Sequence, residues 1–540
     1  MMRNLVACGC VLFTSTLAFA QDKLLAADRP IEQAVDHYID AKLKAEGITP
    51  APPADDAAIL RRLTLDLNGR IPTLTEVDDY LKNSDTDKKT KLVDRLLASS
   101  AFSRHGAQTF YAFMQYSDGQ PRKGAKGNRL YDYLLASFTE NRGWDRIFKE
   151  IMLPDEKDAK NAGAADFLKT RVKDLNRLTI DASSTFFGVN VSCAQCHDHP
   201  HVQQWTQDQF YGMKSFFART TESGEYLGER DFGVVKYIPN KGTEKISPVL
   251  FLTGKAIDAP GMKDPTGEEK KREQMRLDLG KKPKAPPAPP TFSLRGKLVE
   301  VALAPDSRGF FARNIANRMV HRFLGRGLVM PLDQLHSENP ASHPELLDWL
   351  ARDTVEHGYD LKRLARGLVL TKTYARSSRW ESDKLPDEKL FAVASVRALT
   401  PTQMATSLKI ATADPKSLAT DVEKRIEATE QNASGLANLF AQPNDRFQVG
   451  VAEAMLFANN EGLQKSLLDG PGALPASLAK EPDLTKRAEL AIRTVLGRPA
   501  RSEEVQTLAS YMQRRLDRPD AACQQVVWAL LTSAEFRFNH

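Results

Sequence analysis

Apolar side chains recur at the spacing of one helix face along most of this chain, which predicts a mainly α fold. In the segment "TKLVDRLLASSAF" they stand at positions 92, 93, 96 and 97, which are neighbours on a helix of about 3.6 residues per turn. Local signals divide the pattern into separate helices. We expect a break near Asn68-Gly69, a cap at Thr73 or Thr75 with Glu76 in the next first turn, and a stop at Gly325.

Two segments interrupt the helical pattern. Residues 220–254 contain short β-branched and aromatic runs between glycines, which predict a small β segment. Residues 255–292 contain "DPTGEEKKREQ" and then "KKPKAPPAPP", which predict a charged and proline-rich linker, extended and exposed over its prolines. The resulting division is a signal peptide at 1–20, a helical domain at 28–219, the β segment, the linker, and a helical carboxyl-terminal domain at 293–540.

The first twenty residues, "MMRNLVACGCVLFTSTLAFA", have the three parts of a secretory signal peptide. Arg3 supplies the positive charge, Leu5–Leu17 form the apolar part, and Ala18–Ala20 give the small-x-small pattern before a cleavage site. The apolar part is too short for a transmembrane anchor. We therefore expect cleavage near Ala20 and a periplasmic or secreted protein.

Charge and cysteine content narrow the classes of partner and scaffold. Lys and Arg number 75 against 69 Asp and Glu, a net charge of +6, and this balance gives no reason to expect nucleic acid as a partner. Of the 5 cysteines, Cys8 and Cys10 would leave with the signal peptide, and Cys193, Cys196 and Cys523 would remain. Three cysteines are too few for a disulfide-stapled scaffold. The chain does not need one, because 540 residues of which 41% are hydrophobic are enough to build ordinary hydrophobic cores.

The segment "NVSCAQCHDHPHVQQW" carries the clearest chemistry in the chain. Cys193, Cys196 and His197 form Cys-x-x-Cys-His, the minimal pattern for covalent attachment of a c-type haem. Two residues between the cysteines place both sulfurs on one side of a helical turn, where they can reach the two vinyl groups. The adjacent histidine then faces the iron from the same side. We expect haem c here, with His197 as the proximal iron ligand, and its attachment on the exported side agrees with the signal peptide.

The second axial ligand of the iron stays open. His199 and His201 follow His197 too closely to reach the opposite haem face easily, and Met213 is far enough away to do so; these three are the weaker ligand candidates. Further histidines could come from other helices, and five-coordinate iron is also possible. These further candidates are His105, His321, His336, His343 and His357.

Two other kinds of site compete with haem at this segment. Zinc usually takes four sulfur and imidazole ligands, which Cys193, Cys196, His199 and His201 could supply. A redox dithiol would need a strand before the motif and a helix after it, and a short strand is possible at Phe186–Val191. The chain has no phosphate-cradling loop, Gly-x-Ser-x-Gly elbow or His-Glu-x-x-His motif, so whether it is an enzyme stays undecided.

The block "FFGVNVSCAQCHDHPHVQQWTQDQFYGMKSFF" resembles a cytochrome-like domain of unknown function that is abundant in exported planctomycete proteins. The later block "NRMVHRFLGRGLVMPLDQLHSENPASHPELLDWL" is similar to the planctomycete-specific carboxyl-terminal domain of unknown function that normally follows it. Together the two resemblances cover most of residues 30–540. Two departures stand out: "GAQTF" at 106–110 replaces a Trp-x-x-His-Trp pattern, and one extra residue lies between Pro200 and Trp205.

The resemblance implies Cys193, Cys196 and His197 as haem-binding residues in an exported c-type cytochrome-like protein. It also implies electron transfer or another haem-based redox role, with a redox partner or a neighbouring exported sulfatase-like protein. An alternative is a helical scaffold or binding module with a zinc or disulfide site, associated with exported polymer-degrading enzymes. A third hypothesis is a hydrolase of such a polymer.

Overall fold

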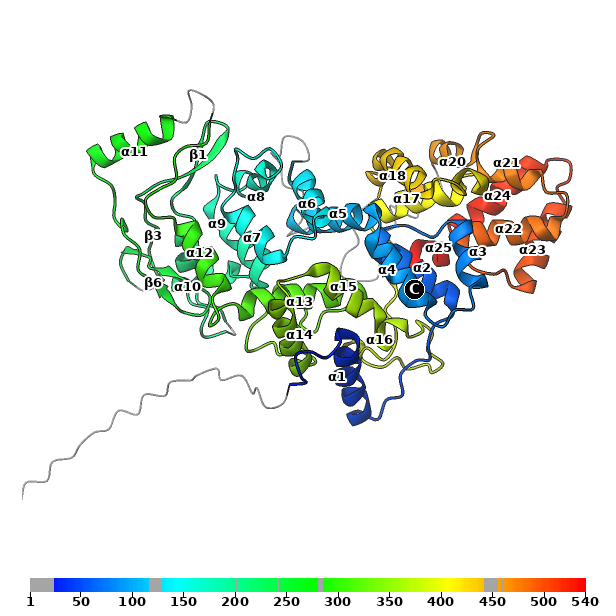
Figure 1. The fold of residues 1–540 in the computed structure, drawn as a ribbon, viewed down its shortest axis with the longest axis horizontal. Coiled ribbons are helices and arrows are strands. Elements are labelled where there is room, and N and C mark those ends of the chain that lie inside the picture. The colour runs from blue at the N-terminus through cyan, green and yellow to red at the C-terminus, as the bar shows by residue number, and fades with distance from the viewer. Residues whose placement is uncertain are drawn as a thin grey trace, which may run out of the picture.

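The computed structural model describes residues 24–115, 129–200, 202–240, 242–279, 285–440, 455–457 and 460–540. The predicted mainly α fold is confirmed, since the described strands form only two-stranded sheets between many helices. The molecule is elongated, with β1–β6 and α11 at one end, α17–α25 at the other, and α5 and α13–α15 between them (Figure 1). The predicted signal peptide lies outside the described residues.

A large hydrophobic core is built by helices from both sides of the predicted linker. Phe311 on α13 lies 5.0 Å from Phe148 on α7 and 6.3 Å from Trp144, measured between ring centroids. Residues before 220 and after 292 therefore share one core. Its helices are α1 (Ile31–Ala45), α2 (Asp56–Asn68), α3 (Leu74–Lys82), α4 (Lys88–Ala98), α5 (Ser100–Gln115), α6 (Arg129–Thr139), α7 (Trp144–Met152), α8 (Asp166–Lys169), α9 (Leu175–Ala182), α10 (Gln207–Ser215), α12 (Leu294–Leu303), α13 (Gly309–Leu324), α14 (Pro344–Glu356), α15 (Leu361–Leu370) and α16 (Lys372–Ala375).

The segment from 220 to 257 contains three short antiparallel pairs of strands. They are β1 (Thr220–Ser223) with β2 (Tyr226–Glu229), β3 (Lys236–Tyr237) with β4 (Lys245–Ile246), and β5 (Val249–Leu250) with β6 (Ala256–Ile257). Within the segment predicted as a linker, the structure has a helix, α11 (Gly267–Leu279). Its Leu277 is buried although most of its other side chains are exposed.

A second hydrophobic core lies at the carboxyl-terminal end of the chain. Leu65 and Ile71, from α2 and the residues after it, also pack into this core, so α2 lies between the two cores. β7 (Arg397–Ala398) pairs with β8 (Phe538–Asn539) and joins the end of the chain to the start of this part. The helices are α17 (Pro401–Thr412), α18 (Val422–Ala437), α20 (Glu461–Leu468), α21 (Leu474–Ala479), α22 (Leu484–Leu496), α23 (Ser502–Gln513), α24 (Pro519–Leu531) and α25 (Ala534–Arg537).

The local helix signals account for most of the observed boundaries. α2 ends at Asn68 before Gly69, and Thr73 caps α3 in a capping box with Glu76. α13 ends before Gly325, whose φ of 83° favours glycine. A possible strand at Phe186–Val191 is wrong: Ser183–Phe187 form a π-helical turn, and within 186–191 only Val189 makes an isolated bridge.

The Glu76 carboxylate makes the stability of this region sensitive to acid. Burial opposes its ionisation, but Arg70, with which it pairs at 2.7 Å, outweighs that effect and lowers the pKa of Glu76 to about 2. Because the folded pKa lies below its ordinary value, the stabilisation is full at neutral pH and is lost as the pH falls from about 4.5 towards 2.

We therefore expect Glu76→Gln to lower the free energy of unfolding by on the order of 2 kcal/mol at pH 7. The difference from the wild type should shrink between pH 5 and pH 2 in urea titrations. Glu46→Gln, at an exposed pair with Lys42, is the control and should change stability by less than about 0.5 kcal/mol. A difference at Glu76 that does not depend on pH would contradict this account.

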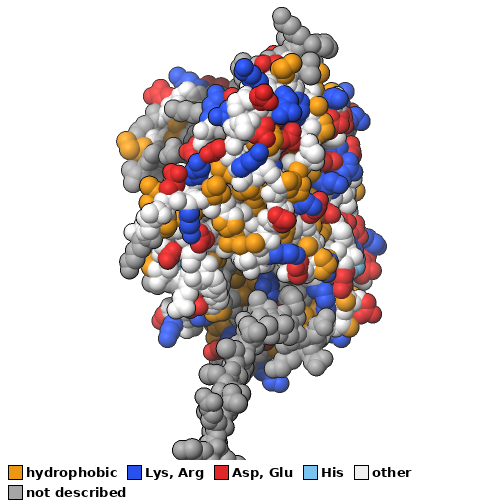
Figure 2. Space-filling view, turned by 90° about the vertical axis from the view of Figure 1, so that its left-hand side faces the viewer, with side chains coloured by type: hydrophobic (Ala, Val, Ile, Leu, Met, Phe, Trp, Pro, Cys, Tyr) orange, Lys and Arg blue, Asp and Glu red, His pale blue; other side chains and the backbone are white. Residues whose placement is uncertain are grey.

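The surface facing the viewer in Figure 2, at the end that carries α11 and the short strands, mixes acidic and basic side chains around hydrophobic ones. Among the helices that the structure describes, none combines the length and apolar character needed to span a bilayer.

Candidate functional site

The Cys-x-x-Cys-His segment forms a short 3₁₀ turn at the surface of the large core. Residues Ser192–Gln195 make the turn, and the Cys196 N–H donates to the Cys193 carbonyl oxygen. Side chains three residues apart lie one above the other on a 3₁₀ helix, which places the two sulfurs on one face. Both thiols are exposed and neither is in a disulfide. Cys193 and Cys196 are therefore two free, exposed thiols at one turn.

The amino-terminal side of this turn is fixed by a distant loop of the chain. The Asn190 N–H donates to the Asp333 carbonyl oxygen at 2.8 Å, and its amide Nδ2 donates to the Asp333 carboxylate at 2.9 Å. The Leu335 N–H donates to the Gly188 carbonyl oxygen at 2.9 Å. The Asn190 Oδ1 also accepts from the Ser192 N–H at 3.1 Å, which directs the chain into the turn.

The carboxyl-terminal side is fixed by α10. The Asp198 carboxylate accepts from the Gln207 N–H at the first residue of α10, at 2.9 Å. The Tyr211 hydroxyl donates to the Gln195 carbonyl oxygen at 3.2 Å. Burial and the neighbouring Cys196 both raise the pKa of Tyr211, so it stays a neutral donor. The turn is therefore held on both sides while its sulfurs remain accessible.

His197 directly follows Cys196 in the chain, and one nitrogen of its ring has a hydrogen-bonding partner. Its Nδ1 lies 2.8 Å from the Asp198 carbonyl oxygen, to which a protonated Nδ1 donates, and the ring is exposed. A donated Nδ1 proton leaves the lone pair on Nε2, the arrangement that metal-binding histidines use. Two exposed thiols on one face and a histidine with an oriented Nε2 are a donor set that fits a covalently attached haem.

The weaker ligand candidates lie in different environments. Met213 on α10 is fully buried in the large core. His199 accepts from the Val202 N–H through Nδ1 at 3.1 Å, and its ring contacts Trp205. His201 lies outside the described residues.

Of the five more distant histidines, His336 is the one that the structure brings against the motif loop. Its ring centroid lies 5.0 Å from that of Trp205 and 6.1 Å from that of His199. His343 packs against Phe391 elsewhere, and burial lowers its pKa to about 4. It stands at the N-cap of α14 without a capping bond from its side chain. His105, His321 and His357 lie on or at the ends of helices α5, α13 and α14.

Zinc and a redox dithiol were the two alternatives to haem at this segment, and the structure gives one observation on each. Among the residues that the structure describes, no group of three or more His, Cys, Asp or Glu side chains could hold a metal ion. The described sheets are antiparallel pairs, so the strand and parallel unit that a thioredoxin-type dithiol requires do not precede the turn.

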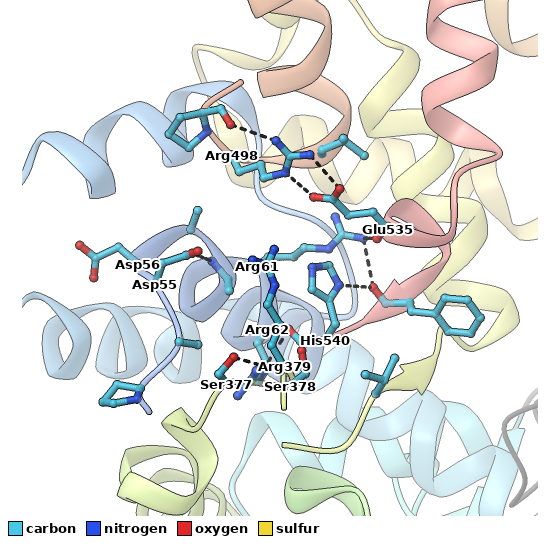
Figure 3. A pocket seen from close by; sticks show the side chains of 18 of the residues that line it. Asp55, Asp56, Arg61, Arg62, Ser377, Ser378, Arg379, Arg498, Glu535 and His540 are labelled. Atoms are coloured by element: carbon cyan, nitrogen blue, oxygen red, sulfur yellow. Dashed lines mark hydrogen bonds and ion pairs between the residues drawn. The ribbon is translucent and has the colours of Figure 1, made fainter. Parts of the chain in front are cut away.

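A cavity of about 980 Å³ lies away from this turn, between α2, the loop at 377–379 and the carboxyl-terminal residues (Figure 3). Its arginines, Arg61 and Arg62 among them, were not singled out from the sequence, where they stand between leucines at helical spacing. The one available signal was the pair of adjacent cations among the regularly spaced leucines of this helix.

Two family models match this chain. Residues 34–222 match PSCyt2, described as a protein of unknown function (DUF1549), and residues 295–435 match PSD1, described as a protein of unknown function (DUF1553). The two matches support the predicted order of a planctomycete-type pair of domains of unknown function. No curated protein and no solved structure matches the chain.

Proposed function

We propose that this protein is an exported c-type cytochrome-like protein that carries one haem on Cys193 and Cys196. The observation that supports the proposal is the 3₁₀ turn with its two exposed thiols, followed directly by His197, whose Nδ1 lies 2.8 Å from the Asp198 carbonyl oxygen. In this proposal Cys193 and Cys196 would hold the haem through thioether bonds, and His197 would bind its iron through Nε2. The haem would supply one-electron redox chemistry.

The chain's own residues would position that group. The anchors at Asp333 and Gln207 keep the turn in one conformation before attachment, so little ordering cost remains. The Asp198 carbonyl oxygen sets the tautomer of His197. We further propose that electrons pass to a redox partner in the same exported compartment, with a sulfatase-like neighbour as the second candidate partner.

The experiment is expression of the full chain in a bacterial periplasm with and without a cytochrome c maturation system. We expect a Soret band that stays with the polypeptide after acid–acetone extraction, in the first culture alone. Dithionite should then sharpen the α-band, because the iron changes oxidation state. Zinc is measured in the same samples: one zinc per chain and no covalent haem in either culture would replace this proposal by the zinc-stabilised binding module.

A further inference from the structure

The cavity between α2 and the carboxyl-terminal residues contains more positive than negative side chains. Five arginines line it against three carboxylates. The arginines are Arg61, Arg62, Arg379, Arg498 and Arg501, and the carboxylates are Asp55, Asp56 and Glu535. Figure 3 shows Arg61 and Arg62 in the middle of the labelled side chains.

The three carboxylates are already engaged with other groups. Glu535 pairs with Arg498, whose Nη2 lies 2.8 Å from its Oε2. Asp55 caps α2 by accepting from the Ala58 N–H, and Asp56 pairs with Lys88 at 2.6 Å. Each carboxylate therefore forms its hydrogen bonds with a partner other than the two central arginines, although Glu535 and Asp55 still act on these arginines through space.

Arg61 and Arg62 are buried cations whose hydrogen bonds, among the described residues, all go to backbone oxygens. Their guanidinium groups also lie over the rings of Phe536 and Tyr374. Arg61 is 2% exposed, and its Nη2 donates to the Phe536 carbonyl oxygen at 2.7 Å while its Nε and Nη1 have no partner. Arg62 is 3% exposed, and its Nη1 donates to the Arg376 carbonyl oxygen at 3.0 Å while its Nη2 has none. Carboxylates act on both arginines through space, but among the described residues no carboxylate side chain forms a hydrogen bond with either guanidinium group. A bound anion would therefore offset part of the cost of burying these two charges.

The charge state of these groups suits an anion at neutral pH. Burial lowers the pKa of Arg61 to about 10, and Glu535 offsets part of this effect. Because this pKa is still well above 7, Arg61 is positively charged at neutral pH. Burial and the nearby Arg61 lower the pKa of His540, which is therefore neutral and offers a ring nitrogen for hydrogen bonding.

Apart from Ser377, Ser378 and His540, the rest of the lining is apolar. Pro53, Leu81, Val396, Leu496 and Pro499 form parts of the wall. The volume of about 980 Å³ lies at the upper end of the range for sites that take small organic molecules. An inorganic ion would leave most of this space and these apolar walls without contacts.

We propose that this cavity binds a small organic oxyanion, whose carboxylate, sulfate or phosphate group lies against Arg61 and Arg62. The apolar part of the ligand then packs against the proline, leucine and valine walls. The site is separate from the Cys-x-x-Cys-His turn, and it does not depend on whether haem is bound there.

Isothermal titration calorimetry on the full chain tests this with four probes of similar size: benzoate, phenyl sulfate, phenyl phosphate and the uncharged benzyl alcohol. We expect at least one anion to bind about tenfold more tightly than benzyl alcohol, with weaker binding at higher salt. The anion that binds most tightly shows whether the site prefers a planar carboxylate or a tetrahedral sulfate or phosphate group. Equal affinities for benzyl alcohol and all three anions would overturn the proposal.

Variants locate the binding. Arg61→Gln should lower the affinity for the most tightly bound anion about tenfold or more. Arg379→Gln, at an exposed residue of the lining, should lower it about threefold. Arg272→Gln on α11 removes an exposed arginine that does not line this cavity and should leave the affinity unchanged. Should Arg61→Gln fail to fold, Arg379→Gln and the charge-preserving Arg379→Lys decide the question. Wild-type affinity in Arg379→Gln would then reject the site.

Discussion

Replacing Asp66 with alanine is expected to lower the free energy of unfolding by about 3–5 kcal/mol, the usual cost of breaking a buried ionic network. The Asp66 carboxylate is buried on α2 and accepts three hydrogen bonds, each of 2.8 Å, from groups distant in the chain. The donors are the Tyr374 hydroxyl, Arg397 Nη2 and Asn539 Nδ2. Without the carboxylate, these donors lose their acceptor in an environment from which water is largely excluded.

Urea unfolding followed by tryptophan fluorescence measures this effect. Asp66→Asn should cost less than Asp66→Ala, because an amide keeps an acceptor for the tyrosine. Asp94→Ala is the matched control, since Asp94 forms an exposed pair with Arg366 and should contribute about 0–1 kcal/mol. If Asp66→Ala and Asp94→Ala cost the same, the buried network is not the source of the stability.

The second large effect concerns the two exposed thiols. In cells with a cytochrome c maturation system, Cys193→Ala/Cys196→Ala should contain no covalent haem, because both thioether bonds are lost. Each single variant should keep one bond and show a displaced α-band. The double variant should also fold as the wild type does, since both side chains are exposed and the turn is held by backbone and polar contacts.

Cys523→Ala is the matched thiol control. This cysteine is fully buried in the second core, and burial raises the pKa of its thiol, so it is a poor nucleophile. Its removal should leave the haem content per folded chain unchanged. Haem that stays covalently bound to the double cysteine variant would show that attachment occurs at another residue.

Helix boundaries were predictable because their signals are local. The cap at Thr73 needs only Glu76 three residues later, and the end at Gly325 needs only a residue that tolerates positive φ. By contrast, α11 lies where charge and proline predicted a linker. Its sequence has little apolar periodicity. Buried Leu277 and the hydrogen bonds that Glu273 and Arg276 form with residues distant in the chain attach it to the rest of the fold.

The candidate site also has a part that local sequence predicts and a part that it does not. The residues of the turn could be identified from Cys193 to His197, because their chemistry depends on spacing within one segment. The anchor at Asp333 could not, since it lies more than a hundred residues away and no local pattern marks it. The burial of Arg61 and Arg62 could not be predicted either, because their hydrogen-bond acceptors are backbone oxygens of distant residues such as Phe536 and Arg376.

The shared aromatic centre of the large core has a consequence for how the two matched segments occur in proteins. Phe148 and Phe187 belong to the first segment, and Phe311, which packs against both, belongs to the second. Each segment alone would expose large apolar surfaces that the other covers, and such surfaces promote aggregation. Selection should therefore keep the two segments together in one polypeptide, as a pair that is inherited and lost as a unit.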